Sequence, residues 1–377
     1  MGFVSAAVIL LLVTGCASRP TSVVLQPIAN PPSYTNKVHL LVATTRERGS
    51  TDDPDAFTAG RAKHLNFASL TVSIPTHHVT GEIEWPDQTP PDPARHFVTT
   101  DREFLDVGGF KDQIRARARQ GGPEANSVLV FVHGYNTLYE EAVYWLAQIV
   151  NDSGFKGTAV LFAWPSRGKA PLYLADREAS TYSRDYLEQA LMQMSTLPEV
   201  KEIDILAHSM GTWLAVETLR QAKMNGNGDF KGKLGEVILA SPDLDVTVFR
   251  TQLDVIGRLP QPMTVLVSGD DKALALSTKL AGDVDRVGRV TADDARAIEA
   301  AQTYNLRVVD LTAVDDGEGN NHSKYSKSEA VMSAIGNGLQ AKSAGVQAQP
   351  GVVSAFTNAG NSLLQVPAAI LGAAAPQ

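Results

Sequence analysis

Residues 203–220 read IDILAHSMGTWLAVETLR, and they carry the strongest structural signal in the chain. An apolar run typical of a buried strand passes through a small-x-Ser-x-Gly turn into a helical pattern. A serine at such a sharp turn stands above the end of the sheet, where the first N–H groups of the following helix point. Ala207 and Gly211 are small because strand and helix pass close together. The pattern predicts Ser209 as an activated nucleophile; the alternative is an ordinary turn with a capping serine.

A second segment supplies the expected oxyanion site. Residues 127–136 read SVLVFVHGYN, an apolar run that fits a strand buried on both faces, followed by a tight turn. An acyl-transfer site needs two N–H donors for the developing oxyanion. We assign them to Met210, directly after the nucleophile, and to Tyr135. Gly134 allows the backbone to approach closely, and His133 is expected to hold its loop in place.

The general base follows from the order of residues along the chain. A serine nucleophile needs a histidine to take its proton and an acid to orient that histidine, and here the expected order is Ser, acid, His. Of eight histidines, only His322 follows Ser209, and it lies in a loop behind a predicted strand. For the acid, either Asp270 or Asp271 could orient the histidine, since both follow a predicted strand and a glycine turn; we favour Asp271. Asp243 and Asp245, behind the preceding strand, are the competitors.

These segments resemble the α/β-hydrolases of the DUF900 type, a bacterial branch of the esterase and lipase-like superfamily. The resemblance implies an α/β-hydrolase fold, with a mostly parallel central sheet and helices on both faces, and a triad of Ser209, Asp271 and His322. It implies no substrate. Asn321 stands where the family pattern leads us to expect glycine. The matching segments are 43–46, 72–75, His78, Gly81, 131–136, 163–166, Gly168, Tyr173, Asp176, 207–211, 240–243, 271–274 and 322–323.

Strand and helix patterns alternate along most of the chain, which predicts a parallel sheet covered on both faces, with the first two strands partly antiparallel. One hydrolase domain is therefore expected over 37–342. It is preceded by a flexible tether over 17–36 and followed by an uncharged, low-complexity tail over 343–377. We expect strands at 38–44, 68–74, 127–133, 158–164, 202–207, 235–240, 263–268 and 305–312, and helices at 138–152, 176–195, 211–224, 246–257, 291–302 and 323–340.

The first 16 residues resemble a bacterial lipoprotein signal peptide. The apolar stretch at 6–13 is too short to span a membrane, and it leads into Val-Thr-Gly-Cys, where Cys16 is the only cysteine of the chain. We expect Cys16 to be lipidated; a secretory signal cut elsewhere or an uncleaved anchor is the alternative. Because Ala17 and not aspartate follows, the resemblance favours the periplasmic side of the outer membrane in a bacterial cell envelope.

Charge and composition exclude several classes of partner. The net charge is −8 and no basic run is present, which disfavours nucleic acid and electrostatic docking on anionic lipid. His77 and His78 have no third ligand at a useful spacing, so we expect no metal, and the chemistry needs no organic cofactor. The sequence does not indicate an oligomeric state.

Together these features predict a lipid-anchored serine hydrolase, a carboxylesterase that cleaves small-molecule or lipid esters through an acyl-enzyme. The short segment 165–200 offers at most a small cap, which favours soluble short-chain esters over bulk lipid. An acyltransferase or amidase would use the same triad. A hydrolase-like envelope lipoprotein that binds a partner without turnover is a third reading, against which the intact Ser, Asp and His order counts. Trp164, Tyr135, Tyr139 and Tyr173 either line an acyl pocket or pack in the core, and the sequence favours neither.

Overall fold

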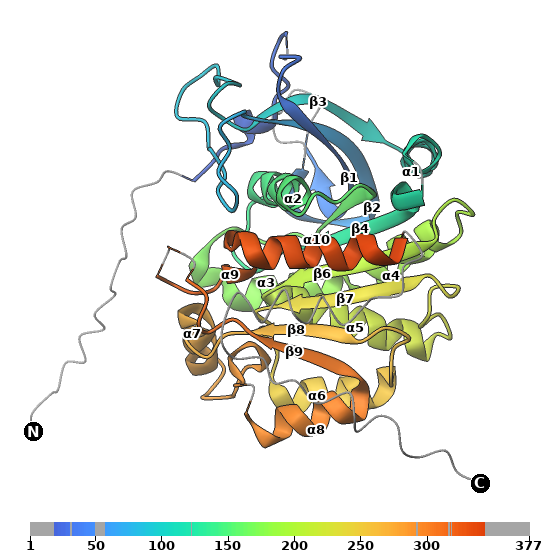
Figure 1. Ribbon diagram of the computed structural model, residues 1–377, viewed down its shortest axis with the longest axis vertical. Coiled ribbons are helices and arrows are strands. Elements are labelled where there is room, and N and C mark those ends of the chain that lie inside the picture. The colour runs from blue at the N-terminus through green and yellow to red at the C-terminus, as the bar shows by residue number, and fades with distance from the viewer. Residues whose placement is uncertain are drawn as a thin grey trace, which may run out of the picture.

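A nine-stranded mixed sheet forms the centre of the computed structural model, which describes residues 19–30, 32–49, 57–121, 123–291, 293–315, 317 and 319–343. Among these residues the strand order is β3-β2-β1-β5-β4-β6-β7-β8-β9 (Figure 1). The pairs β1–β2 and β2–β3 are antiparallel and the others parallel. The strands are β1 (Asn36–Arg48), β2 (Phe57–Ile74), β3 (Val98–Leu105), β4 (Ser127–Val132), β5 (Thr158–Ala163), β6 (Glu202–His208), β7 (Leu234–Ala240), β8 (Met263–Val267) and β9 (Leu306–Asp310).

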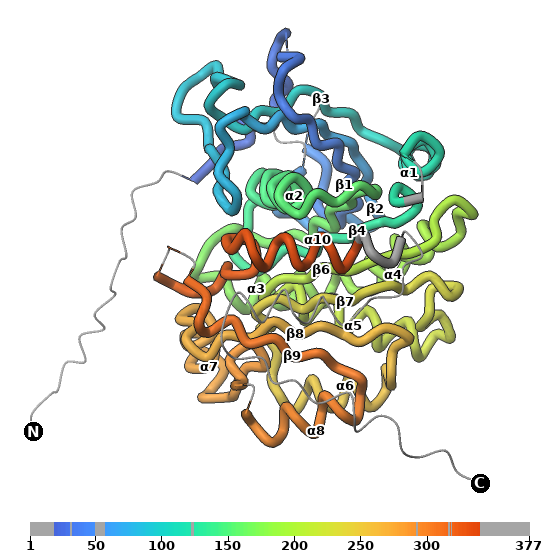
Figure 2. The backbone as a smooth tube through the Cα atoms, in the orientation of Figure 1, coloured from blue at the N-terminus to red at the C-terminus, as the bar shows by residue number. Residues whose placement is uncertain are grey.

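Helices cover both faces of this sheet, and α2 and α10 lie in front of it in Figure 1. The chain path in Figure 2 places the N-terminal strands and the C-terminal strands at opposite edges. The helices are α1 (Val107–Gln120), α2 (Tyr139–Ser153), α3 (Tyr173–Tyr182), α4 (Arg184–Ser195), α5 (Met210–Met224), α6 (Val246–Ile256), α7 (Lys272–Leu280), α8 (Ala295–Tyr304), α9 (Lys324–Lys327) and α10 (Glu329–Ser343).

The apolar run of β4 is buried on both faces because helices pack on each side. Val128, Val130 and Val132 belong to a core shared with α4, α5 and α6. Leu129 and Phe131 point the other way, into a core shared with α2 and α10. This alternation is what a central parallel strand requires. The predicted α/β-hydrolase fold, with its partly antiparallel first strands, is confirmed.

Two expected helices are interrupted: the one over 323–340 divides at Ser328, whose backbone is extended, into α9 and α10, and the one over 176–195 divides at Ser183. The Ser183 hydroxyl donates to the carbonyl of Ala179 (2.9 Å) and also bonds the Thr45 hydroxyl on β1 (2.7 Å). A serine that bonds back to the preceding turn bends a helix. The chain therefore turns at Ser183, which separates α3 from α4.

Three elements were not expected from the sequence: β3, α1 and α7. The first turn of α1 contains Gly108 and Gly109, which are poor helix formers, and the helix is capped by Asp106, whose side chain accepts from the Gly109 N–H (2.7 Å). The nine-residue α7 starts at its own cap, Asp271, whose side chain accepts from the Leu274 N–H (2.9 Å). Caps and packing, rather than propensity, define these short elements.

The expected tether is not free from residue 19 onward. Leu25 is 1% exposed within a short 3₁₀ turn. The Val24 carbonyl accepts hydrogen bonds from the hydroxyls of Tyr144 (2.6 Å) and Thr99 (3.1 Å). The flexible composition of 17–36 was therefore misleading, because one buried leucine and these bonds hold this segment on the domain. Cys16 and the tail beyond residue 343 lie outside the described residues.

Candidate active site

Ser209 occupies a strained turn between β6 and α5. Its backbone has φ +53° and ψ −124°, a conformation that non-glycine residues rarely adopt. The Ser209 N–H donates to the carbonyl of Ala240 on the adjacent β7 (2.9 Å), and the Thr212 N–H donates to the Ser209 carbonyl (3.0 Å). A Cβ at Gly211 would lie 2.4 Å from the His133 carbonyl oxygen, so only glycine fits there. The neighbouring strand and helix thus hold the serine in place.

The turn after β4 passes directly beside this elbow. A Cβ at Gly134 would lie 3.0 Å from the Cβ of Ser209, so glycine allows the close approach. Within the described chain, no acceptor takes the N–H of Tyr135 or of Met210. Met210 is the first residue of α5, where a helix has no internal acceptor for its N–H groups. Both donors expected for an oxyanion are therefore available next to Ser209.

Asp176 holds this turn from the first turn of α3. Its fully buried carboxylate accepts from the Asn136 N–H (3.1 Å), the Ser166 hydroxyl (2.6 Å) and the Arg167 N–H (2.7 Å). These partners come from the loops that follow β4 and β5. Asp176 therefore fixes the residue after Tyr135 without contacting Ser209. The family resemblance singled out Asp176, but the sequence alone indicated no role for it.

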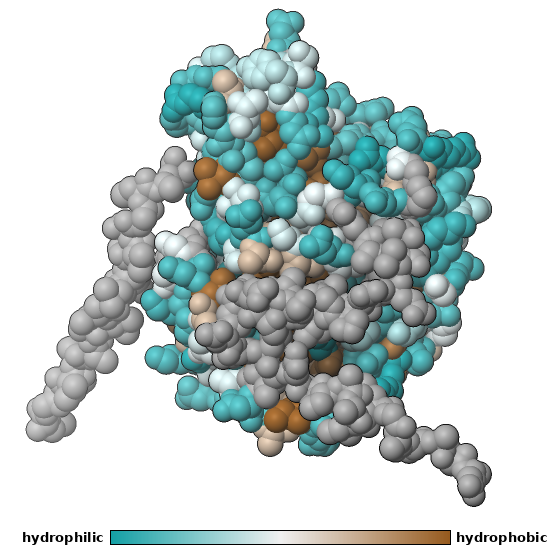
Figure 3. All heavy atoms as spheres, viewed as in Figure 1, coloured by the Kyte–Doolittle hydropathy of each residue, from teal (hydrophilic) through white to brown (hydrophobic). Residues whose placement is uncertain are grey.

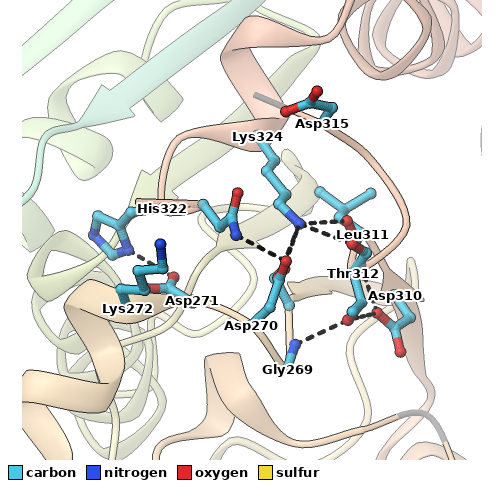
Figure 4. A network of polar contacts seen from close by, with 12 residues as sticks. Gly269, Asp270, Asp271, Lys272, Asp310, Leu311, Thr312, Asp315, His322 and Lys324 are labelled. Atoms are coloured by element: carbon cyan, nitrogen blue, oxygen red, sulfur yellow. Dashed lines mark hydrogen bonds and ion pairs between the residues drawn. The ribbon is translucent and has the colours of Figure 1, made fainter. Parts of the chain in front are cut away.

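His322 and Asp271 meet at the same end of the sheet. The Nδ1–H of His322 donates to Oδ2 of Asp271 (2.7 Å), and Asp271 is fully buried (Figure 4). The other oxygen of Asp271 accepts from the Leu274 N–H at the start of α7 (2.9 Å). Because the first turn of α7 and His322 both bind this carboxylate, its position is fixed. Asn321, where glycine was expected, has φ +61°, a conformation that asparagine tolerates better than most residues.

The neighbouring aspartate, Asp270, binds the His322 loop at two residues, Asn321 before the histidine and Lys324 after it. We call the contacts between Asp270 and Lys324 the clamp. The buried Lys324 ammonium, 2% exposed, donates to both Asp270 oxygens (2.9 and 3.0 Å) and to the carbonyls of Leu311 (3.2 Å) and Thr312 (2.9 Å) (Figure 4). The Asn321 side-chain amide donates to the same carboxylate (2.8 Å). The Lys324 ammonium thus joins three segments of the chain: the one after β8, the one after β9 and the loop that carries His322.

The competing acids have other partners. Asp243 accepts from the hydroxyls of Ser277 (2.5 Å) and Tyr173 (2.9 Å), and its carboxylate lies 3.4 Å from Nε of Arg286. Asp245 caps α6 by accepting from the Thr247 N–H (2.7 Å). Of the four candidate acids, Asp271 is therefore the one that binds His322 in the described structure, while Asp270 binds Lys324. Asp243 lies in the cavity wall as part of a buried ion pair.

Two further histidines flank the elbow and are held neutral. Burial and the charge of Arg46 lower the pKa of His133 to about 3, and its ring nitrogens face the carbonyls of Gly134 (2.9 Å) and Trp164 (3.1 Å). Burial, followed by the neighbouring His322, lowers the pKa of His208 well below its usual value. The Nε2–H of His208 donates to the His322 carbonyl (3.3 Å), and the two rings lie 4.7 Å apart. Both residues therefore support the loops around Ser209.

A cavity of about 750 Å³ lies over the elbow, and both Ser209 and His322 line it. Tyr135 and Tyr173 also line it, whereas Trp164 and Tyr139 are buried in the core. Of the four aromatic residues that could either line an acyl pocket or pack in the core, two therefore line the cavity and two belong to the core. Its other lining residues include, on one side, Leu274, Leu276 and Leu280 of α7, and elsewhere Arg19, Ile83, Trp85, Glu141, Trp145 and Lys327.

Metal ligands are not assembled in the described part of the chain: no group of three or more His, Cys, Asp or Glu side chains there could hold an ion. His78 instead lies between Glu84 (2.9 Å) and Asp152 (2.8 Å). Among the described helices, none is long and apolar enough to cross a membrane.

The sequence matches a family model described as an α/β-hydrolase of unknown function (DUF900) over residues 112–338, more than half of the chain. The chain belongs to this family. No curated protein matches the DUF900 hydrolase.

Solved structures give distant likenesses to the DUF900 hydrolase. Lipase B of Aspergillus fumigatus is 14% identical with a TM-score of 0.36, over 60% of this chain and 56% of the lipase. Esterase B of Lactobacillus rhamnosis, in complex with a tributyrin phosphonate inhibitor, is 9% identical with a TM-score of 0.34, over 85% of this chain and 83% of the esterase. The fold assignment therefore rests on the sheet itself and on the family match.

Lys324 is the site residue that sequence reasoning missed; Asp270 was considered as the acid, but the structure makes it the partner of Lys324. Lys324 stands two residues after His322 and Asp270 one residue before Asp271. A lysine in a polar loop gives no sign that it is buried, since most lysines are exposed. Only the approach of three distant segments reveals the clamp.

Proposed function

We propose that the DUF900 hydrolase is a carboxylesterase that works through Ser209, His322 and Asp271. The observation that carries this proposal is the 2.7 Å hydrogen bond between His322 and Asp271 at a cavity that Ser209 also lines. The strained backbone of Ser209 and the available N–H groups of Tyr135 and Met210 support it further. An unreactive binding protein has no need for these features together.

The reaction proceeds in two steps. The Ser209 hydroxyl oxygen attacks the ester carbonyl while Nε2 of His322 takes the hydroxyl proton, and the N–H groups of Tyr135 and Met210 bind the oxyanion. His322 returns the proton to the leaving alcohol, which departs as the carbon–oxygen bond breaks. Water then attacks the acyl-enzyme and loses its proton to His322; the bond between the acyl carbon and the Ser209 oxygen breaks, His322 returns the proton to that oxygen, and the acid is released. Asp271 orients the ring and stabilises its charged form throughout.

As part of the same proposal, Cys16 carries lipid and holds the enzyme on the periplasmic side of the outer membrane. The lipobox pattern at Val13–Cys16 supports this location. Stable attachment needs more than one acyl chain, which lipoprotein modification supplies.

Product analysis with a soluble short-chain ester, 4-nitrophenyl butyrate, tests the proposed reaction. We expect a burst of nitrophenol followed by steady release of butyrate, because the acyl-enzyme forms before it is hydrolysed. Adding an alcohol or an amine measures how the acyl group is partitioned. Butyrate as the main product supports an esterase, whereas dominant ester or amide products would make transfer the reaction. No turnover by the folded protein would contradict both.

A further inference from the structure

We propose that the mouth of the catalytic cavity is held against the membrane surface by the N-terminal lipid, and that the substrate is an acyl ester of a membrane lipid. This inference rests on the proposed function, both its serine chemistry and its anchor. Two independent features of the described chain carry it: the position of Arg19 and the apolar rim of the cavity.

Arg19 fixes the start of the described chain at the cavity. Its guanidinium forms an ion pair with Glu141 and donates to the Gly168 carbonyl (2.6 Å), the Asn136 carbonyl (2.6 Å) and the Asn136 side chain (3.0 Å). Both Arg19 and Asn136 line the cavity, and Asn136 directly follows Tyr135. The chain therefore enters the domain beside the proposed oxyanion site. In Figure 1 the start of the described chain, α7 and α9 all lie along the left side of the molecule.

The chain length between Arg19 and Cys16 limits how far the anchor can be. Cys16 precedes Arg19 by three residues, and a fully extended chain spans at most about 3.5 Å per residue, which gives about 10 Å. A lipidated cysteine lies at the headgroups, because its acyl chains are inside the bilayer. Arg19, and with it the cavity mouth, must then lie within about 10 Å of the membrane surface.

The rim of the cavity offers apolar surface to that membrane. Leu276 and Leu280 of α7 line the cavity and are 59% and 61% exposed. Leu174, 74% exposed, adjoins Tyr173, whose hydroxyl contacts that of Ser277 on α7 (3.2 Å). Leu172, Leu174, Leu276 and Leu280 make up four of the nine large hydrophobic side chains that are exposed in the described chain. We call these four leucines the apolar rim.

This arrangement matches a lipid ester better than a soluble one. The visible face of the molecule in Figure 3 is mostly hydrophilic, with small hydrophobic areas. Two exposed leucines in the cavity lining, and two more on either side of the lining residue Tyr173 in the chain, are therefore distinctive. The overall charge of −8 gives no attraction to anionic lipid, so contact must come from the anchor and the rim. The leucines of α7 in the cavity lining give an acyl chain apolar contacts on its way to Ser209.

The test uses the full-length, lipid-modified protein in phosphatidylethanolamine vesicles that contain a fluorogenic diacylglycerol ester. In Leu174→Glu a charge replaces the most exposed rim leucine, which lies outside the cavity lining. The matched control is Met224→Glu, also well exposed (61%) but at the far end of α5, about 21 Å along the helix from Met210. We expect Leu174→Glu to lower the vesicle rate about tenfold, the effect of losing one buried leucine, while Met224→Glu leaves it unchanged.

A second variant tests the anchor position. A 20-residue Gly/Ser linker inserted directly before Arg19 has an average end-to-end distance of about 25 Å. The cavity mouth is then no longer held at the membrane surface by the lipid on Cys16. The linker should lower the vesicle rate, while all variants hydrolyse 4-nitrophenyl butyrate at the wild-type rate. Equal vesicle rates for Leu174→Glu and Met224→Glu, or an intact mass without lipid on Cys16, would overturn this inference and leave the esterase standing. If the wild type does not hydrolyse 4-nitrophenyl butyrate, the proposed function itself is overturned.

Discussion

Lys324 shows how one buried charge can organise a reactive loop without touching substrate. Its ammonium binds the Asp270 carboxylate and two carbonyls after β9. Asp270 adjoins Asp271, and Lys324 stands two residues after His322, so the clamp sets the distance between the proposed acid and base. We regard Lys324 as a positioning residue for that pair.

Replacing this lysine should slow the reaction step more than it weakens binding. In Lys324→Met the three segments are no longer joined, and a displacement of His322 by about 1 Å should lower kcat about 100-fold, with KM nearly unchanged. Steady-state kinetics with 4-nitrophenyl butyrate measure both. Lys279→Met, which removes an exposed lysine of α7, should leave both values unchanged.

A stability measurement separates positioning from simple loss of fold. Removing one partner of a buried ion pair destabilises a protein, whereas replacing both partners by apolar residues is often neutral. The double variant Asp270→Leu/Lys324→Met should therefore melt closer to the wild type than Lys324→Met does, yet keep a low kcat. Recovery of kcat together with Tm would show that the lysine acts through stability alone.

The loop from β2 to β3 forms one wall of the catalytic cavity, and His78 anchors it to α2. His78 on this loop lies between Glu84, also on the loop, and Asp152 on α2. Burial alone would lower the pKa of His78, but these two carboxylates raise it to about 9. Burial acts to raise the pKa values of Asp152 and Glu84, but their bonds, including those to His78, lower both. The loop is thus held by a charged cluster near neutral pH.

The raised pKa predicts how stability depends on pH. Because the folded pKa of His78 lies above its unfolded value of 6.5, its contribution is complete below pH 6.5 and is lost as the pH rises through about 9. At about 1.4 kcal/mol per pKa unit, His78→Gln should reduce the free energy of unfolding by at most about 3 kcal/mol near pH 6, and much less at pH 10. Urea unfolding at pH 6, 8 and 10 measures this difference.

The exposed His64 provides the control for the loop anchor. His64→Gln removes a histidine that has no such cluster, so its effect on unfolding should be small at all three pH values. A constant penalty for His78→Gln between pH 6 and pH 10 would mean that the charge of His78 does not hold the loop.

Long periodic elements could be predicted from the sequence, whereas breaks and short elements could not. The strand ending at the elbow and the helices α2 and α5 were expected within one or two residues of their observed bounds. The break at Ser183 depends on the Thr45 hydroxyl of a strand more than a hundred residues away. The start of α7 depends on Asp271, whose second partner is His322. Such tertiary partners override local propensity and leave no local trace in the sequence.

For the molecule as a whole, parallel strand order explains why residues so far apart meet. The chain passes the same edge of the sheet after β4, β6, β8 and β9, and it leaves Tyr135, Ser209, Asp271 and His322 there in turn. The order of these residues along the chain could be predicted because this architecture fixes it. The docking of the N-terminal segment at the same edge could not, because it depends on the side-chain contacts of Arg19 and Leu25.

The serine chemistry can be tested by the intact mass of the full-length protein after exposure to a fluorophosphonate probe. Such probes react with serines that an adjacent base has activated. We predict one adduct on the wild type, none on Ser209→Ala and slow labelling of His322→Ala, with all three proteins folded by circular dichroism. Labelling of Ser209→Ala at the wild-type rate, or no labelling of the folded wild type, would contradict the assignment of Ser209 as the nucleophile.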